Sequence, residues 1–241
     1  MKIQAIYLNN VGPIVNQKLD FYDDWSGKIF NRVLFSGPNG SGKSILLKAI
    51  AELWQATGHW LEKRTPLPAN QSATSATKKW LQQWGGIAMI LTELPLVTTK
   101  VGLVFGKQRW FQEIEQEFPE VQWLGEIKAD QKDTGSLKLP DTEWLTEWSE
   151  ARSKLILTFD SANTPNMIYL DAEECRWVPP KRRVGRLLPD DSRLRWLVKY
   201  QVTEDWQGQL ESSLINLKVT KLHAYHEMIR QFNQFLKDKR I

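Results

Sequence analysis

The chain has 241 residues, of which 41% are hydrophobic and 25% charged; this composition is typical of a folded globular protein and excludes a disordered or fibrous one. No uninterrupted run of about 18 apolar residues occurs, so we expect no membrane-spanning helix and no membrane partner. Cys175 is the single cysteine, which excludes an intrachain disulfide. The first residues carry no secretion signal, so we expect a cytoplasmic protein. The formal net charge of +4 is mildly basic.

The residues ahead of position 37 predict three strands separated by turns. Residues 2–8 suit a strand, and residues 14–21 suit a second, with Val15, Leu19 and Phe21 on one face and a turn at 9–13 between the two. A second turn at 23–27 precedes a short apolar run at 33–36. We expect this run to form a third, buried strand that leads into the glycine-rich segment after it.

The glycine-rich segment fits the phosphate-binding P-loop pattern, with the sequence Gly37-Pro38-Asn39-Gly40-Ser41-Gly42-Lys43-Ser44. Its glycines allow successive backbone N–H groups to turn toward one phosphate chain. The N-terminus of the helix expected over residues 45–54, ending near Gly58, adds partial positive charge. Lys43 can reach the β and γ phosphates, and the Ser44 hydroxyl is placed to bind Mg²⁺. We therefore expect a bound nucleoside triphosphate.

Two insertions are expected in the middle of the chain. The first covers about residues 57–85 and contains an exposed, polar loop at 65–77, rich in Ser, Thr, Asn and Pro, followed by a short helix at 78–84. The second covers about residues 126–142 and is polar and turn-rich. Both insertions are expected to project from the domain that holds the glycine-rich segment.

Later apolar runs predict strands and then helix. Residues 87–91 and 101–105 are expected to form a strand pair, and residues 155–160 and 167–171 a hairpin around a turn-like sequence. Residues 201–241 carry apolar side chains at helical spacing and are expected to be helical throughout.

The P-loop form, with two strands and a Gly12-Pro13 turn upstream, resembles the ABC-type ATPases of the RecF, SMC and overcoming-lysogenization-defect group. Residues 2–14 are similar to the usual start of these proteins, and residues 232–236 are similar to a helix that shortly precedes their C-terminal lobe. The resemblance is strong over residues 1–54 and loose elsewhere.

The resemblance implies an α/β fold and a nucleotide site. Residues 1–200 would form a P-loop NTPase lobe of the ABC-ATPase kind with an N-terminal antiparallel β-subdomain, and residues 201–241 a helical segment leading to a C-terminal lobe. Residues 37–44 would bind ATP, with Lys43 on the phosphates as the catalytic lysine and Ser44 on Mg²⁺. In that group ATP lies between two heads and drives a conformational change, in DNA-repair or phage-defence type systems.

Motifs that the group carries after the P-loop are missing. No Leu-Ser-Gly-Gly-Gln-like signature follows Ser44, and neither Asp160 nor Asp171, each at the end of an apolar run, is followed directly by glutamate. Asp171 and Glu173 could orient Mg²⁺ and water, or simply end a hairpin and pair with nearby arginines. We expect an N-terminal ATPase lobe, either truncated or completed by a second lobe or subunit, so that turnover would need elements from outside this chain.

A basic segment from Arg176 to Lys199 leaves further alternatives open. With Trp177 and Trp196 interleaved, it could grip a nucleic-acid backbone or stack a base, or it could be a solvated loop or a surface for an acidic partner. It could also serve as the arginine-rich lid of a P-loop small-molecule kinase. The alternatives to an ATPase lobe are therefore such a kinase and a nucleotide-stabilised nucleic-acid-binding module, whereas a GTPase is disfavoured because no Asn-Lys-x-Asp follows the loop.

Overall fold

The computed structural model describes residues 1–68, 73–95, 97–129, 135–140, 143–158, 164–170, 197–200, 217–219 and 221–237. The chain divides into two compact units, the first made of Met1–Tyr169 and Ser192–Val198 and the second of Leu170–Asp191 and Lys199–Ile241. The first unit contains the main sheet and the glycine-rich loop. Among the described helices, none combines the length and apolar character that crossing a membrane requires.

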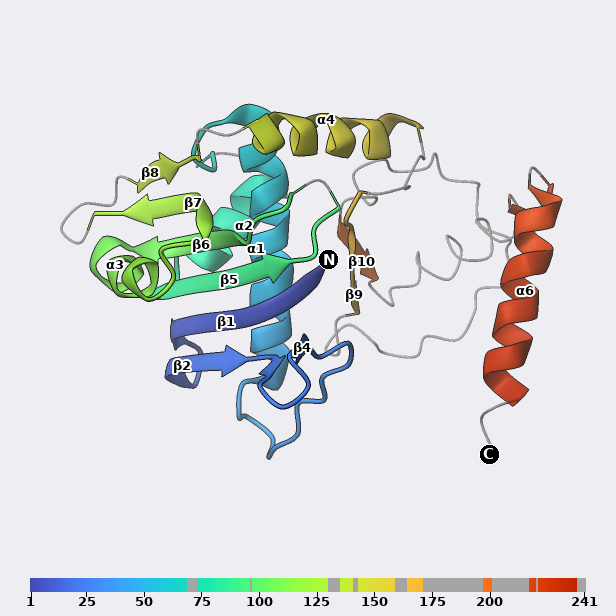
Figure 1. Ribbon diagram of the computed structural model, residues 1–241, viewed down its shortest axis with the longest axis horizontal. Helices are drawn as coiled ribbons and strands as arrows, with labels where there is room; N and C mark the ends of the chain where they lie inside the picture. Colours follow the sequence, from blue (N-terminus) through green and yellow to red (C-terminus); the bar gives the residue numbers. More distant parts are fainter. Residues whose placement is uncertain are drawn as a thin grey trace. The chain divides into compact units, whose positions relative to one another are not determined.

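A six-stranded mixed sheet forms the centre of the first unit, with the strand order β2-β1-β5-β6-β7-β8 (Figure 1). Its strands are β1 (Lys2–Val11), β2 (Ile14–Asp20), β5 (Gly86–Thr92), β6 (Val101–Lys107), β7 (Gln122–Lys128) and β8 (Gly135–Lys138). Neighbours are antiparallel except β6 and β7, which run parallel and are connected through helix α3 (Gln108–Glu117). The strands expected at 2–8, 14–21, 87–91 and 101–105 are confirmed, and the chain is mixed α/β.

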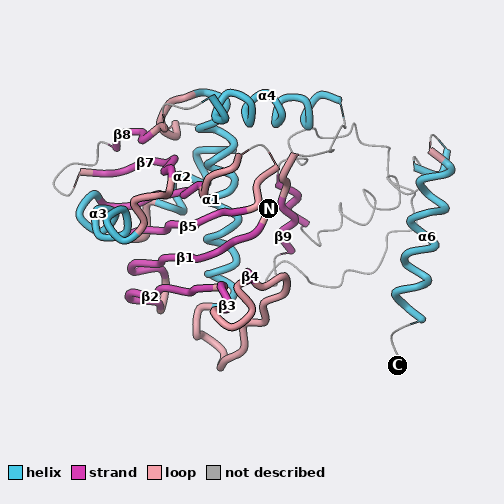
Figure 2. Tube along the Cα trace, viewed as in Figure 1, coloured by secondary structure: helices cyan, strands magenta, loops and turns pink. Residues whose placement is uncertain are grey.

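Helices cover both faces of this sheet (Figures 1 and 2). Successive side chains of a strand point to opposite faces, so Ile6 and Leu8 of β1 join the core under α1 (Lys43–Lys63), whereas Ala5 and Tyr7 join the core under α3. Helices α2 (Ala73–Leu81) and α4 (Glu143–Thr158) pack onto α1. Burial on both faces explains why β5 and β6 are almost continuously apolar.

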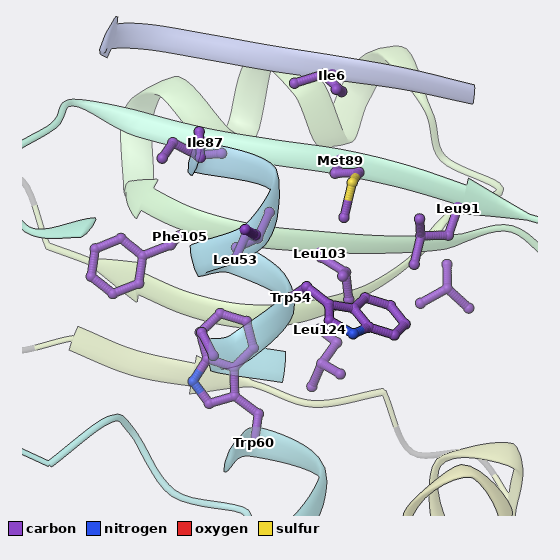
Figure 3. Packing of buried hydrophobic residues seen from close by; sticks show 14 of the residues in the cluster. Ile6, Leu53, Trp54, Trp60, Ile87, Met89, Leu91, Leu103, Phe105 and Leu124 are labelled. Atoms are coloured by element: carbon purple, nitrogen blue, oxygen red, sulfur yellow. The ribbon is translucent and has the colours of Figure 1, made fainter. Parts of the chain in front are cut away.

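Tryptophans of α1 fill the space between helix and sheet. Figure 3 shows Trp54 among Met89, Leu103 and Leu124 of the strands, with Trp60 further along α1, and all five side chains are fully buried. Burial of a large apolar side chain stabilises the fold by about 1.5–3 kcal/mol. The aliphatic and aromatic residues on this face therefore fix the position of α1, and with it the loop at its N-terminus.

Helix α1 is longer than expected. It continues through Gly58 to Lys63, because Gly58 is buried and the residues that follow it, Trp60 and Leu61, are fully buried against the core. Termination comes at Arg64, which adopts a left-handed conformation with φ of 53° and donates its backbone N–H to the Trp60 carbonyl at 3.1 Å. Burial of the last two turns outweighs the helix-weakening effect of glycine.

The expectation of an exposed loop over residues 65–77 is confirmed only at its start, where Thr65 and Pro66 are exposed and lack regular secondary structure, and is wrong further along. Leu67 is buried, and residues from Ala73 onward form α2, so the short helix expected at 78–84 exists but begins earlier. Ser75 and Thr77 are buried, and the Thr77 hydroxyl donates a hydrogen bond to the Glu52 carboxylate of α1 at 2.7 Å. The polar composition therefore reflects a helix that packs on α1 through small side chains.

The expected hairpin over residues 155–171 is wrong in its first arm. Residues 155–158 are the last turn of α4, because the buried side chains of that helix, Trp144, Leu145 and Trp148, follow a helical period. The second arm exists as β9 (Met167–Leu170), which pairs with β10 (Leu197–Tyr200). The end of the first arm and the start of the turn-like sequence, residues 159–163, lie outside the described residues.

Helix α6 (Leu222–Lys237) belongs to the second unit and confirms the helical expectation over that range. Residues 217–219 are also helical. Residue 221 is not helical, and the rest of the segment expected to be helical, residues 201–216, 220 and 238–241, lies outside the described part of the chain.

Candidate functional site

The glycine-rich loop lies at the N-terminus of α1. Gly40 and Gly42 have φ values of +83° and +95°, in the left-handed region that favours glycine. Gly42 is also the N-cap residue of α1, and no side chain caps the helix there. The first N–H groups of an α-helix have no partner within the helix, so this end of α1 presents backbone donors and partial positive charge.

Lys43 is held inside the loop by the loop itself. Its ammonium nitrogen Nζ donates hydrogen bonds to the carbonyl oxygens of Gly37 at 2.8 Å and Pro38 at 2.7 Å, and lies 3.2 Å from the Ser41 hydroxyl oxygen. The backbone N–H of Ser41 bonds the Pro38 carbonyl at 3.3 Å and closes the turn. The loop thus places a cation beside the open helix N-terminus.

The turn between β1 and β2 supports the loop from the sheet side. A Cβ atom added to Gly42 would lie 3.1 Å from carbons of Pro13 and Ile14, and one added to Gly12 would lie 2.6 Å from Cδ1 of Ile45. Gly12 has a φ of +56°, which the tight hairpin turn requires. This close packing joins the loop to the first hairpin, so the position of the loop depends on the sheet.

The outer side of the loop is open and positively charged. A Cβ atom added to Gly40 would meet nothing within 4 Å, and the Ser44 side chain in the first turn of α1 is exposed. No aspartate or glutamate occurs from Trp25 to Ala51, a stretch that contains four basic residues: Lys28, Arg32, Lys43 and Lys48. An anionic group can therefore approach without meeting a carboxylate from this stretch.

Residues 33–36 do not form the buried strand expected ahead of the loop. They have no regular secondary structure, and Val33 and Leu34 are exposed. Phe35 alone faces the core, where its ring lies 6.2 Å from that of Phe21. Among the described residues, no backbone hydrogen bond joins residues 31–36 to another backbone group, so this run has no neighbouring strand that would bury it.

Other sequence candidates are not brought to the loop by the described structure. Asp171, Glu173 and the basic residues from Arg176 to Arg195 lie outside the described residues, and Lys199 is in β10. Within the described ranges, no group of three or more His, Cys, Asp and Glu side chains could hold a metal ion. Mg²⁺ binding by Ser44 stays a prediction from the loop pattern.

One buried polar cluster was not expected from the sequence. Glu126 of β7 is 2% exposed and accepts a hydrogen bond from the Leu67 backbone N–H at 2.9 Å, while Lys78 of α2 lies 3.8 Å from its other oxygen and donates to the Leu67 carbonyl. A glutamate inside the apolar run of a buried strand is the signal that could have indicated it. The cluster attaches the segment after α1 to the sheet.

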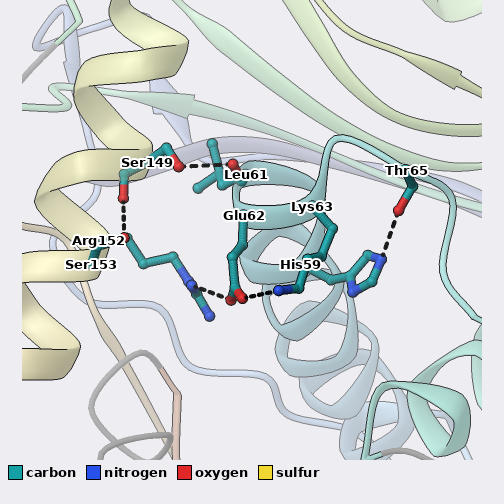
Figure 4. Close-up of polar contacts among 8 residues, drawn as sticks. All are labelled: His59, Leu61, Glu62, Lys63, Thr65, Ser149, Arg152 and Ser153. Atoms are coloured by element: carbon teal, nitrogen blue, oxygen red, sulfur yellow. Dashed lines mark hydrogen bonds and ion pairs between the residues drawn. The ribbon is translucent and has the colours of Figure 1, made fainter.

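A second polar cluster connects α1 and α4 (Figure 4). Arg152 pairs with Glu62 at 3.0 Å, and the Ser149 hydroxyl donates to the Leu61 carbonyl at 2.8 Å. His59 lies on the same helix with its Nε2 3.5 Å from the Thr65 hydroxyl, and burial lowers the pKa of this imidazole. These contacts join α1 to α4 and to Thr65, the second residue after α1, so we assign them a structural role.

Comparisons with known proteins find no relative of this chain. A scan against protein-family models finds no match to the chain, and searches of curated proteins and of solved structures find none either. The candidate site is therefore defined by the geometry of residues 37–44 and by the chemistry of their side chains.

Proposed function

We propose that the chain binds Mg·ATP through residues 37–44 and acts as the nucleotide-binding lobe of an ABC-type ATPase with a P-loop fold. One observation carries the proposal: the Lys43 ammonium lies against the Gly37 and Pro38 carbonyls, at the uncapped N-terminus of α1. A helix N-terminus with a glycine loop and a lysine is suited to a polyphosphate. The absence of acidic residues in the first turn of α1 favours the same ligand.

Binding would proceed by an exchange of partners within the loop. Lys43 would leave two neutral carbonyl oxygens and bind the β and γ phosphates, gaining charge-assisted hydrogen bonds. Backbone N–H groups of the loop and of the first turn of α1 would donate to the phosphate oxygens. The Ser44 hydroxyl would contribute one ligand to Mg²⁺, which neutralises charge on the phosphates.

A second lobe or subunit would complete the site. The chain lacks the signature and Asp-Glu motifs that the resembling ATPases carry, so we assign those groups to a partner. Closure of the two parts around ATP would couple nucleotide binding and hydrolysis to a conformational change, in a DNA-repair or phage-defence type system. Nucleic acid is a candidate partner for the basic segment from Arg176 to Lys199.

Calorimetric titration of Mg·ATP tests the nucleotide site. We expect Lys43→Ala to weaken binding at least tenfold, since a hydrogen bond to a charged group contributes about 1.5–3 kcal/mol. Lys48→Ala is the matched control: its ammonium belongs to the same helix but lies 5.9 Å from the Trp80 ring centroid. Equal affinity of both variants for Mg·ATP would exclude residues 37–44 as the site.

Turnover measured in the same sample tests whether the site is complete. We expect binding with negligible hydrolysis by the chain alone, because the partner supplies the missing groups. Steady hydrolysis that disappears in Lys43→Ala would contradict the need for a second lobe and leave the nucleotide site intact. Ser44→Ala should make affinity for ATP insensitive to added Mg²⁺.

A further inference from the structure

The segment between β4 (Lys28–Ile29) and the glycine-rich loop exposes a concentration of apolar side chains. Leu34 is 90% exposed, Phe30 49% and Val33 46%, all within five consecutive residues. Single exposed apolar residues are ordinary on protein surfaces, whereas contiguous ones mark interaction sites. The position directly ahead of the candidate nucleotide loop makes this segment relevant to the proposed function.

The backbone of this segment has free hydrogen-bonding capacity. Backbone pairing ends on one side where the Phe30 N–H donates to the Phe21 carbonyl at 2.9 Å, and on the other side the Gly37 carbonyl is occupied by Lys43. Between them, no backbone N–H or C=O of residues 31–36 bonds another backbone group among the described residues. Such a row of donors and acceptors is a template for an added strand.

The segment is nevertheless anchored to the body of the first unit. The ring of Phe35 packs on that of Phe21 with a centroid distance of 6.2 Å, and Phe35 is partly buried against the core. Phe35 contacts the core of the first unit, whereas Val33 and Leu34 are exposed. The segment therefore has one apolar contact with its own unit and two apolar side chains that another polypeptide could cover.

Charge around the segment indicates the chemistry of that partner. Lys28 and Arg32 are exposed beside the apolar residues, and no carboxylate occurs from Trp25 to Ala51. A strand with acidic residues at its ends would pair its apolar middle with Val33 and Leu34 and its carboxylates with these cations.

We propose that residues 32–36 are a docking edge for a β-strand of another polypeptide, apolar in its middle and acidic at its ends. The inference rests on the proposed function, because a strand docked here would end beside the loop that holds Lys43. It identifies where the second lobe attaches: the partner strand pairs with the segment that leads directly into the nucleotide site.

Hydrogen exchange of the backbone amides of residues 33–36 tests whether the edge is free. In the isolated chain we expect fast exchange, and the same rate at low and high protein concentration. Protection at low concentration would mean that this chain covers its own edge, and protection that grows with concentration would mean that a second copy does. Either result would overturn the proposal.

Synthetic strand peptides test the partner chemistry. The probe is a fluorescent peptide with a Val-Ile-Val-Leu middle and two Glu residues at each end, and the control peptide has Lys in place of Glu. We expect the acidic peptide alone to bind and to slow amide exchange at residues 33–36. Arg32→Glu should reverse the preference toward the Lys-ended peptide. The proposal fails if neither peptide binds, or if both bind equally.

Two variants separate this inference from the nucleotide site. Leu34→Asp should weaken acidic-peptide binding at least about tenfold, because a leucine side chain is no longer buried, while Mg·ATP affinity is unchanged. Val15→Asp is the control, since Val15 is 73% exposed on β2. Conversely, Lys43→Ala should weaken Mg·ATP binding and leave the affinity for the acidic peptide unchanged. Loss of peptide binding in Val15→Asp to the same extent as in Leu34→Asp would refute docking at residues 32–36.

Discussion

The indole rings of Trp54 and Trp148 pack against each other, with centroids 6.0 Å apart and planes inclined at 51°. Trp54 belongs to α1 and Trp148 to α4, and both are almost completely buried. Trp144 extends the cluster, its ring 5.9 Å from that of Trp148. Through these rings, α4 stabilises the long helix that carries the candidate nucleotide loop at its other end.

Trp148→Ala should destabilise the first unit strongly. Truncation of a buried tryptophan removes its transfer free energy and leaves a cavity, so we expect the free energy of unfolding to fall by about 3–5 kcal/mol. Denaturant unfolding followed by circular dichroism measures it. The control is Trp25→Ala, since Trp25 is 97% exposed and its removal should change stability by less than about 0.5 kcal/mol. Similar losses in both variants would contradict the packing of α4 on α1.

Glu126→Ala should lower the free energy of unfolding more than the loss of an exposed ion pair does. It leaves the Leu67 N–H without its acceptor in a buried site, which we expect to lower the unfolding free energy by about 1–3 kcal/mol. The comparison is Glu120→Ala, which removes an exposed ion pair to Lys100 at 3.0 Å and should cost less than about 1 kcal/mol. Equal costs in urea unfolding would show that Glu126 does not attach the segment to β7.

Stability should decrease as the solution is acidified below about pH 6.5, in part because of His59. Burial lowers the pKa of His59 in the folded state, whereas the unfolded chain has an ordinary value of about 6.5. Between the two pKa values the unfolded state binds more protons than the folded state, so the free energy of unfolding decreases as the pH is lowered. His59 is partly exposed, and solvent screening keeps this decrease small.

Replacement of this histidine provides the check. His59→Gln cannot titrate, so its unfolding free energy should vary less between pH 7.5 and 5.5 than that of the parent chain. The nearby Glu62 carboxylate, whose pKa Lys63 and then Arg152 lower from 4.5, contributes only at lower pH. An unchanged pH dependence in the variant would mean that His59 is not buried in its neutral form.

Two glycines of the loop should respond differently to alanine. Gly40 and Gly42 both have positive φ, so either substitution strains the backbone by about 1–3 kcal/mol. Only at Gly42 would the new Cβ also press on Pro13 and Ile14, at 3.1 Å, whereas at Gly40 the space is open. We therefore expect a larger drop in melting temperature and in Mg·ATP affinity for Gly42→Ala. A larger effect at Gly40 would contradict the packing of the β1–β2 turn on the loop.

Local patterns predicted the parts of the fold that depend on nearby residues. The strand pair over residues 86–107 follows from apolar runs buried on both faces, and the geometry around Lys43 follows from eight consecutive residues. The run at 33–36 shows the limit of such patterns. Its residues favour burial, but sequence alone does not show whether a neighbouring strand pairs with them, and among the described residues none does.

Features built from distant segments could not be predicted. The apolar run at 155–157 fits a strand as well as a helix, and the choice depends on where Trp144 and Trp148 pack. The Glu126 cluster unites a strand, a helix and a loop residue, Leu67, that are far apart in the chain. Such contacts depend on tertiary structure, which periodicity does not encode.

The pairing of β1 with β5 has a consequence for synthesis on the ribosome. Lys2 pairs with Thr92, so the first strand to emerge waits for a neighbour that is translated only after α1 and α2. Until then the nascent chain has only the β1–β2 hairpin to pack against Trp54 and Trp60, which leaves these side chains available to chaperones. The candidate nucleotide loop is translated early but reaches its folded position only after β5 has left the exit tunnel.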